Sequence, residues 1–491
     1  MKHALLSYCR SLLLPALLCA ASVAAQDVQI LGDRSITGTA RYTAMAGAMA
    51  SVGADPSAVL DNPAGLGLYR RMEVSLSLSE QIERNKQLRE DFVTGHVFAL
   101  PQASLVFALE NRNPEGGLRF CNFMLSYNRL RSFSSQSLAW GVNQPSLAGL
   151  MIDQVANVDE RTLAASQYNN DNTGWLSELG YWTYMINPAY DINAEGDTLG
   201  FLGWDAAYGI APATAVKVEE GGYLDEFAFH WAANINNAWH VGLGLNVRSL
   251  YYTKHLTYEE ALSSVNQDYL RHHAYVRQSG AGFSASAGVI WQPLSFLRAG
   301  LAIQSPVLAS VSTRTNSAMT LFDSGNAPGA ETLVYQHRDK LTLPLRTTAG
   351  LTFLFGRKGL LSLQYDYRHI AHINDIHTLK LGAEFVPINN LFLNLGYACE
   401  SDFRRDDQLF FLKTNDVRTD GDFRHRLTAH YASAGIGFRS NVFVAQLAYQ
   451  FGFRNSRLYP FAVSDPDFSP APFDMNTMTH RIVLTLAWHT H

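Results

Sequence analysis

Histidine is the residue type that most invites a chemical interpretation, because the chain contains 16 of them. Two groups stand out, Arg271-His272-His273 and the pair His369 and His372. Neutral imidazoles bind metal ions and haem iron, but neighbouring residues of a strand point to opposite faces of a sheet. A metal or haem site would need further ligands from elsewhere in the chain, and we therefore expect no metal and no cofactor.

Catalytic motifs are absent from the sequence. It has no G-x-S-x-G, no H-E-x-x-H, no C-x-x-C and no Walker sequence. The sequence pattern alone does not exclude a lipase whose catalytic Ser and His lie on one face of a β-sheet. We expect a protein that is not an enzyme.

Composition narrows the class of protein further. The net charge is −5, so the chain lacks the excess of positive charge that is typical of nucleic-acid-binding proteins. Charged residues make up 16% and aromatic residues 12% of the chain, whereas an ordinary soluble domain has about 25% charged residues. Beyond the N-terminus no apolar run reaches the ~20 residues of a membrane-spanning helix. The chain is therefore either a large secreted β protein or a protein that crosses a membrane as strands.

The N-terminus has the features of an export signal. Lys2 and Arg10 precede a short apolar run, and Val23-Ala24-Ala25 offers the small residues of a cleavage site. We expect a signal peptide over residues 1–25. A lipoprotein signal at Cys19 is the alternative, although Leu18 is large for the residue before a lipidated cysteine.

Alternation of apolar and polar residues gives the fold class. In Leu361 to Arg368 every odd position is apolar or aromatic and every even position is polar, and segments around Val442 to Phe451 and after Thr479 repeat this. About fourteen such segments are separated by connections that are alternately very short and long. This pattern predicts an all-β fold, a transmembrane antiparallel β-barrel of about 14 strands over residues 71–491 with long extracellular loops. The predicted segments begin near Met72, Gln102, Leu118, Tyr223, Trp239, Arg277, Phe296, Leu341, Leu360, Ile376, Leu391, His430, Val442 and Thr479.

The alternation also assigns the two faces of the wall. An arginine or lysine facing lipid at mid-membrane costs ~2–4 kcal/mol, so charged residues within these strands must face the lumen. We expect a network of paired charges there, with a selective ion path as the alternative. The inward residues are Arg346, Asp366, Arg368, Lys380, Glu384 and Arg481.

A lumen of fourteen strands is too wide for side chains of the wall to fill. Residues 26–70 precede the first strand and are rich in Ala, Gly and Ser between Gly38 and Leu68, which suits close packing in a confined space. We expect this segment to be an N-terminal hatch that plugs the lumen. It should contain a short helix over Ala44 to Val52, and the turn Asn62-Pro63-Ala64-Gly65 should return the chain to the wall.

These residues carry a resemblance to a known family. Asp55-Pro56-Ser57-Ala58, followed seven residues later by Asn62-Pro63-Ala64-Gly65, resembles the hatch of the FadL-type, TodX-like transporters of hydrophobic compounds. The stretches Leu297 to Pro306 and Leu341 to Gly356 are similar to later strands of that family. The resemblance implies uptake of hydrophobic substrate from outside and sideways release into the bilayer through a gap in the wall. It also implies gating by Asn62, Pro63, Ala64 and Gly65, although the turn alternatively only starts the first strand.

The long loop over residues 134–222 holds two apolar stripes at helical spacing. These stripes either pack on each other or leave a groove for a hydrophobic ligand. The candidate groove residues are Leu147, Leu150, Met151, Trp175, Leu179 and Trp182.

The sequence therefore predicts an outer-membrane channel of a Gram-negative bacterium for passive diffusion of small hydrophobic molecules, either long-chain fatty acids or aromatic hydrocarbons. The alternative is a barrel that does not transport and serves as a surface anchor or shuttle for exported proteins. The expected partners are a hydrophobic small-molecule ligand, outer-membrane lipids and the outer-membrane assembly machinery, with no nucleic acid, and the barrel should be a monomer. Barrels of the resembled family commonly end in an aromatic residue, and here Trp488 either replaces that signal or indicates another assembly route.

Overall fold

The computed structural model describes most of the chain. The described residues are 34–87, 93–113, 117–169, 173–195, 197–263, 268–323, 325–370, 374–402, 409–465 and 468–489. The predicted signal peptide and the first eight residues of the predicted hatch lie outside them. Among the described residues, no helix is long and apolar enough to cross a membrane.

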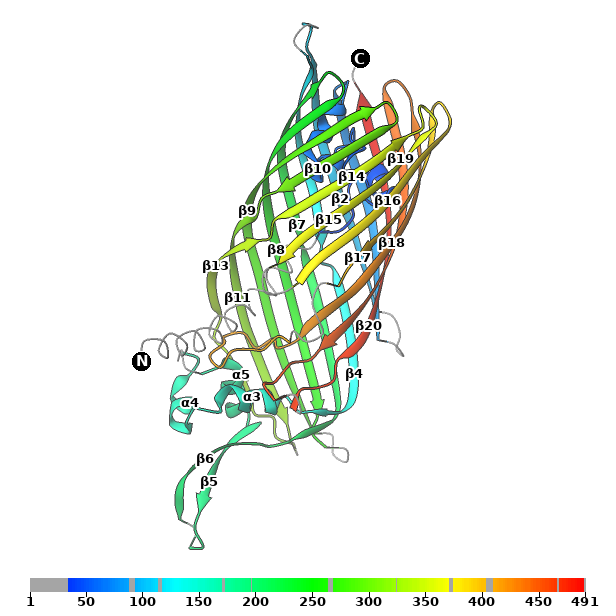
Figure 1. Ribbon diagram of the computed structural model, residues 1–491. Coiled ribbons are helices and arrows are strands. Elements are labelled where there is room, and N and C mark those ends of the chain that lie inside the picture. Colours follow the sequence, from blue (N-terminus) through cyan, green and yellow to red (C-terminus); the bar gives the residue numbers. More distant parts are fainter. Residues whose placement is uncertain are drawn as a thin grey trace, which may run out of the picture.

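The wall is a closed antiparallel sheet (Figure 1). Its first and last strands pair from Glu73 with His489 to Gln87 with Met475, which closes the barrel. Within the described residues the wall has fourteen strand positions, as predicted, because β3 with β4, β10 with β11, and β12 and β13 with β14 each share one position. The strands are β1 (Glu73–Gln87), β2 (Val93–Glu110), β3 (Leu118–Ser132), β4 (Ser135–Pro145), β7 (Ile210–Ile235), β8 (Trp239–Ala261), β9 (Tyr269–Leu294), β10 (Leu297–Gln304), β11 (Val307–Phe322), β12 (Gly329–Glu331), β13 (Tyr335–Leu343), β14 (Arg346–Leu354), β15 (Gly359–Ile370), β16 (Asn374–Ile388), β17 (Leu391–Glu400), β18 (Phe423–Arg439), β19 (Phe443–Tyr459) and β20 (Phe473–His489).

The two faces of the wall follow the predicted alternation. On β15, Leu361, Leu363 and Tyr365 are exposed on the outside while Gln364 and Asp366 are buried inside. An apolar outer face is stable in lipid, because every backbone group is already bonded to a neighbouring strand. The outer face therefore forms the apolar band that a membrane barrel requires.

Several strands are longer than predicted. The strand expected from Tyr223 starts at Ile210 in β7, and the strand expected from Gln102 already starts at Val93 in β2. Likewise, β4 uses part of the expected loop 134–222. The apolar outer row ends where strands leave the lipid, since residues such as Lys217 then face outward while Val216 and Val218 pack inside, yet the backbone ladder continues. We call this end of the barrel the loop end and the opposite end, with the short connections, the turn end.

Residues 34–70, the plug segment, lie inside the barrel toward the turn end (Figure 1, blue). They contain α2 (Ala40–Ala44) and two short 3-10 helices, η1 (Ala58–Leu60) and η2 (Pro63–Leu68). The helix predicted over Ala44 to Val52 is wrong, because the chain adopts positive φ at Ala46 and Gly47 and the helix ends before them.

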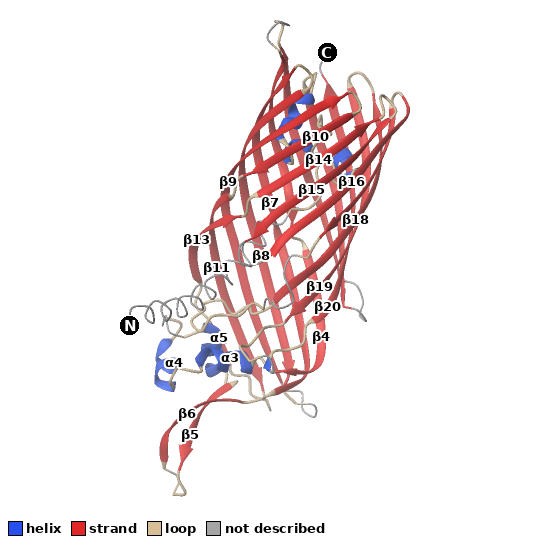
Figure 2. Cartoon of the chain, in the orientation of Figure 1, coloured by secondary structure: helices blue, strands red, loops and turns tan. Residues whose placement is uncertain are grey.

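The loop end contains α3 (Ala148–Val155), α4 (Glu160–Ser166) and α5 (Trp175–Trp182). A hairpin of β5 (Ile186–Ile192) and β6 (Thr198–Ala206) extends beyond these helices (Figure 2). Helices α3 and α5 begin near the two predicted apolar stripes, and they fold because those stripes have a surface to pack on.

Candidate functional site: a plugged lumen

The turn Asn62–Gly65 is fixed to the wall by close backbone contact. The Asn62 side-chain oxygen accepts from the Ala64 N–H at 3.0 Å, and its amide donates to the Val289 carbonyl of β9 at 3.2 Å. A Cβ atom added at Gly242 of β8 would lie 2.3 Å from the Pro63 carbonyl carbon. All four turn residues are buried, so the turn occupies space that inward glycines leave free.

Glycines on the inner face form a belt around the plug segment that the sequence reasoning missed. At each of these positions a Cβ atom would come within about 3 Å of plug atoms. Several of these glycines are directly opposite each other on neighbouring strands. The recurrence of glycine at inward positions of successive strands could have predicted this belt from the sequence, because glycine in a strand often marks a close approach of another backbone. The belt consists of Gly242, Gly288, Gly300, Gly350, Gly382, Gly396 and Gly435.

Asp61 is the electrostatic centre of the plug segment. Its side chain is fully buried and lies 2.8 Å from Arg34, 2.9 Å from Arg346 and 3.8 Å from Lys380. The Tyr42 hydroxyl also donates to it at 2.8 Å. Burial alone would raise the pKa of Asp61, but the surrounding cations outweigh burial and lower it to about 2. Asp61 is therefore ionised at neutral pH and ties the plug segment to the wall.

The inner face of β14 to β20, the charged half, carries the predicted network. Asp366 lies 3.0 Å from Arg346 and 2.8 Å from Lys380. Arg368 lies 3.0 Å from Glu400, and Glu384 lies 2.6 Å from Arg41 of the plug segment. Five of the six predicted inward charges are thus ion-paired. The sixth, Arg481, instead binds neutral partners, among them the Ile36 carbonyl at 2.8 Å.

The inner face of β3, β7, β8, β11 and β13, which we call the apolar half, carries an apolar cluster with polar residues such as Glu226 toward the turn end and Lys254 toward the loop end. Leu60 of the plug segment packs there in a buried apolar cluster. One ion pair, between Arg248 and Glu226 at 2.8 Å, also lies on this side. The wall residues of the cluster are Leu130, Phe133, Leu224, Ala228, Leu250, Tyr252, Val307, Ala309, Val311, Leu341 and Leu343.

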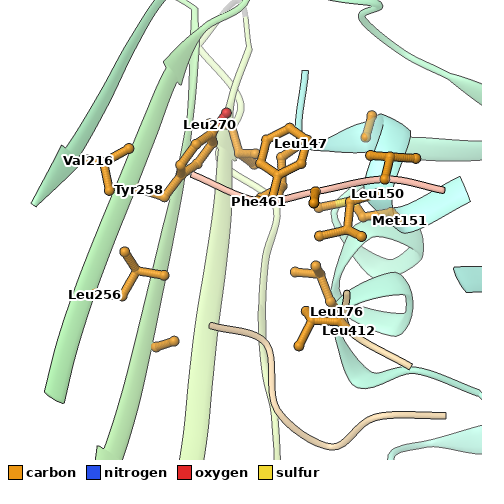
Figure 3. Packing of buried hydrophobic residues seen from close by; sticks show 14 of the residues in the cluster. Leu147, Leu150, Met151, Leu176, Val216, Leu256, Tyr258, Leu270, Leu412 and Phe461 are labelled. Atoms are coloured by element: carbon orange, nitrogen blue, oxygen red, sulfur yellow. The ribbon is translucent and has the colours of Figure 1, made fainter. Parts of the chain in front are cut away.

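The predicted groove residues lie at the loop end. Leu147, Leu150, Met151, Trp175 and Leu179 are buried, while Trp182 is 42% exposed. The first three and Leu179 belong to a second apolar cluster that includes inward residues of the wall and residues of other loops (Figure 3). The five buried residues are covered by neighbouring side chains, so a ligand could contact them only if helices α3 and α5 moved. Their role as a ligand groove stays a prediction.

A buried polar layer separates the two apolar clusters. Lys254 of β8 lies 2.9 Å from Asp420 and 2.7 Å from Asp422, and Arg418 also pairs with Asp420 at 2.7 Å. Burial would raise the pKa of Asp420, but Arg418 and Lys254 hold it below its usual range. This layer brings a loop between β17 and β18 into the barrel mouth. Sequence reasoning missed it because nothing local links Lys254 with residues 418–422.

The wall loses its pairing between β2 and β3. The β2–β3 ladder stops at Gln102 with Asn128, next to Pro101, which has no N–H to donate. Beyond it, β2 continues to pair with β1, while a bulge after Arg129 leaves both Leu130 and Arg131 on the lumen side of β3. The strands approach again where a Cβ atom at Gly95 would lie 3.1 Å from the Ser134 carbonyl oxygen. We call the space between these two contacts the wall window.

An apolar cavity of about 800 Å³ lies on the wall just to the turn side of the window. Its lining is formed by β1, β2, β3, β7 and neighbouring strands, and it includes Leu76, Leu105, Leu125, Phe227 and Phe229. Lipid or a hydrophobic molecule is the occupant that this lining favours.

Neither a metal centre nor a disulfide is found within the part of the chain that the structure describes. No group of three or more His, Cys, Asp or Glu residues there is arranged to hold a metal ion, and Cys121 and Cys399 are free. His272 is buried and His273 is exposed, on opposite faces as expected, while His372 lies outside the described residues.

Comparison with known proteins gives structural matches only. No family model and no curated protein matches the sequence. A Pseudomonas aeruginosa FadL homologue matches with a TM-score of 0.52 and 12% identity, over 93% of this chain and 99% of that one. The Pseudomonas putida toluene transporter TodX matches with a TM-score of 0.51 and 12% identity, over 93% and 99%. The CymD monoaromatic hydrocarbon channel matches with a TM-score of 0.51 and 10% identity, over 94% and 98%. The chain therefore has the fold of the FadL-type outer-membrane channels.

Proposed function

We propose that this protein lets small hydrophobic molecules cross the outer membrane of a Gram-negative bacterium by passive diffusion. The observation that carries the proposal is the apolar half of the lumen, which runs from Leu60 to Leu130 at the wall window. The loop end faces the outside in this proposal, since long loops are extracellular in such barrels. The similar structures include channels for aromatic hydrocarbons.

The route begins at the loop-end cluster, where the predicted groove residues would take up the substrate from dilute solution. Each buried CH₂ group contributes roughly 0.8 kcal/mol, so uptake needs no specific polar contact. The substrate then passes the polar layer around Lys254, which must open, and reaches the apolar half. It leaves through the wall window, past Leu130, into the apolar cavity on the outside of the wall and from there into lipid.

The driving force is the concentration gradient together with partition into the membrane. The turn Asn62–Gly65 has the gating role in this scheme, because it holds the end of the plug segment against β8 and β9. Long-chain fatty acids and aromatic hydrocarbons are the two substrate classes to compare.

Uptake by cells that lack their own transporters tests the proposal. A labelled long-chain fatty acid and a labelled aromatic hydrocarbon are offered to cells that express the wild type, a deletion of residues 26–66 or Leu60→Asn. We expect uptake above the empty-vector level, and about tenfold slower uptake for Leu60→Asn, which corresponds to ~1.4 kcal/mol. Met49→Asn is the matched control, because Met49 is also buried but belongs to a cluster with Leu360 of the charged half.

Wild-type uptake at the empty-vector level, with the barrel inserted in the membrane, would overturn the proposal. Equal slowing by Leu60→Asn and Met49→Asn would also contradict a route along the apolar half, since both changes place the same polar amide in the plug segment.

A second candidate, an anchor for exported proteins, is favoured by the β5–β6 hairpin. It projects from the loop end (Figure 2) and exposes Ile192, Leu199 and Leu202 by 61%, 64% and 70%. Two cavities in the lumen, of about 60 and 100 Å³ and lined mainly by polar and charged residues, also agree with a closed barrel. If neither compound is taken up, an exported protein that binds the wild type but not the Ile192→Asp/Leu202→Asp variant would support this function.

A further inference from the structure

Four cations lie together on the outer face of β9, β11 and β13. Arg277 of β9 is directly opposite Arg314 of β11, and Arg338 and Lys340 of β13 are opposite Ser312 and Ser310 of β11. All four are exposed. They point outward, because the residues that alternate with them, such as Val311 and Leu341, belong to the buried cluster inside the lumen.

This arrangement is unfavourable unless an anion is nearby. Like charges directly opposite each other in an antiparallel sheet destabilise it. Within the described residues none of the four makes an ion pair, and Arg277 contacts the Tyr251 ring at 5.1 Å. Glu331 is opposite Ala318, four residues beyond Arg314 toward the loop end. The patch therefore keeps an uncompensated positive charge.

Other outward arginines of the same wall are neutralised by the protein. Arg271, six residues before Arg277 on β9, lies 2.6 Å from Glu259, and Arg129 of β3 lies 2.7 Å from Asp225. The absence of a carboxylate beside Arg277 and Arg314 is thus a local feature of this patch.

The opposite side of the barrel carries tyrosine–histidine pairs at its outer face. The Tyr365 hydroxyl lies 2.7 Å from His377 Nδ1, and Tyr397 with His430 and Tyr449 with His480 are each 2.8 Å apart. Aromatic residues of this kind suit the interface between lipid tails and head groups. The four cations Arg277, Arg314, Arg338 and Lys340 lie instead in the sector of β9, β11 and β13.

The height of the patch identifies the anion. Leu308 and Phe283 form an exposed apolar pair on β11 and β9, and Lys340 is opposite Ser310, two residues farther toward the loop end. The cations therefore begin where the apolar band ends, at the level of lipid head groups. Guanidinium groups bind phosphate in a bidentate manner, and a cation at the interface costs little compared with one at mid-membrane.

We propose that Arg277, Arg314, Arg338 and Lys340 bind the phosphate groups of an outer-leaflet lipid whose acyl chains lie on the apolar band beside Leu308. The proposal rests on the loop end facing outward but not on transport. A lipid is preferred over free phosphate because the patch adjoins the apolar band, so that head group and chains are bound together.

Lipid retention by the purified full-length barrel tests the site. The wild type and the triple variant Arg277→Gln/Arg314→Gln/Arg338→Gln are reconstituted in phosphatidylcholine nanodiscs with phosphorylated lipid A, and bound lipid is measured by native mass spectrometry. We expect binding at least tenfold weaker in the variant and weakened by salt in the wild type. Arg271→Gln, an outward arginine of the same strand, should bind as the wild type does. Heat-modifiable gel migration verifies that each barrel is folded.

Three results would overturn the proposal. The triple variant, when folded, retains the lipid as well as the wild type; dephosphorylated lipid A binds equally well; or millimolar inorganic phosphate displaces the lipid. The last result would assign the patch to free phosphate rather than to a lipid.

Discussion

The two halves of the inner wall meet the same plug segment with opposite chemistry. Leu60 and Asp61 are adjacent in the chain, yet Leu60 packs into the apolar half while Asp61 is bonded to Arg346 of the charged half. The side chains diverge because η1 ends here and successive residues of a 3-10 helix point about 120° apart. A single residue step at the end of this helix thus separates the apolar side of the lumen from the charged side.

This difference between the two halves explains how a plug can be held in place on one side and displaced on the other. Ion pairs are directional, and a buried pair is costly to break once formed, so the charged half fixes the position of the plug segment. Apolar contacts are non-directional, so the apolar half can exchange protein contacts for contacts with a hydrophobic molecule. In the proposed function, substrate passes along the side where displacement is easy.

Asp61→Asn should have the largest effect on how the charged half holds the plug segment. It removes the carboxylate and leaves Arg34, Arg346 and Lys380 with one buried partner fewer, which costs about 3–5 kcal/mol for a broken buried ion pair. We expect the plug segment to detach, with faster proteolysis of residues 34–70 and greater leakage of a small hydrophilic dye from liposomes.

Asp55→Asn is the matched control for that change. Asp55 is also buried in the plug segment, but its oxygens accept from Thr39 and Ser57 of the same segment. A plug that stays protected in Asp61→Asn would show that the charged half does not hold it.

Lys254→Met tests whether buried ion pairs also hold the loop between β17 and β18 in the barrel mouth. It removes the cation between Asp420 and Asp422 while preserving the length of the side chain, and we expect a loss of about 3 kcal/mol, the lower end for a broken buried pair, because Arg418 remains. The loop should leave the barrel mouth, so that protease on intact cells cleaves after Lys413 or Arg418.

Lys217→Met serves as its control, because that exposed lysine pairs with Glu219 at the surface and such pairs contribute little. Unchanged protection of the loop in Lys254→Met would contradict a role of the polar layer in closing the mouth.

The fold could be predicted from the sequence to the extent that lipid enforces alternation. Leu361 to Arg368 alternates because one face meets hydrocarbon, and the count of fourteen strands follows from such segments. Strand ends could not be predicted, since β7 from Ile210 to Gly222 lies beyond the lipid, where outward positions such as Lys217 and Glu219 are polar instead of apolar.

The site was predicted less completely than the fold, for a physical reason. The turn Asn62–Gly65 is a local motif and can be recognised in the sequence. Its partners Gly242 and Gly288 lie about 180 and 226 positions farther along the chain, and only the closed barrel brings them together. The same holds for Lys254 and Asp420. Contacts between segments that are far apart in the chain leave no recognisable pattern in the local sequence. The burial of the predicted groove residues could not be predicted for the same reason, because they pack against such distant segments.

Gly242→Val should have the smallest effect and tests the plug on its apolar side. A Cβ atom there would lie 2.3 Å from the Pro63 carbonyl carbon, so valine must push the turn Asn62–Gly65 off β8. Overpacking of this kind costs typically 1–3 kcal/mol, less than the loss expected for Asp61→Asn, because the ion pairs of Asp61 remain. We expect dye leakage to rise slightly while proteolysis of the plug segment stays slow. Gly200→Val, at a position with no atom within 4 Å of the added Cβ, should change neither. Release of the whole plug segment by Gly242→Val would mean that both halves hold it equally, and the distinction between a fixed side and a movable side would be wrong.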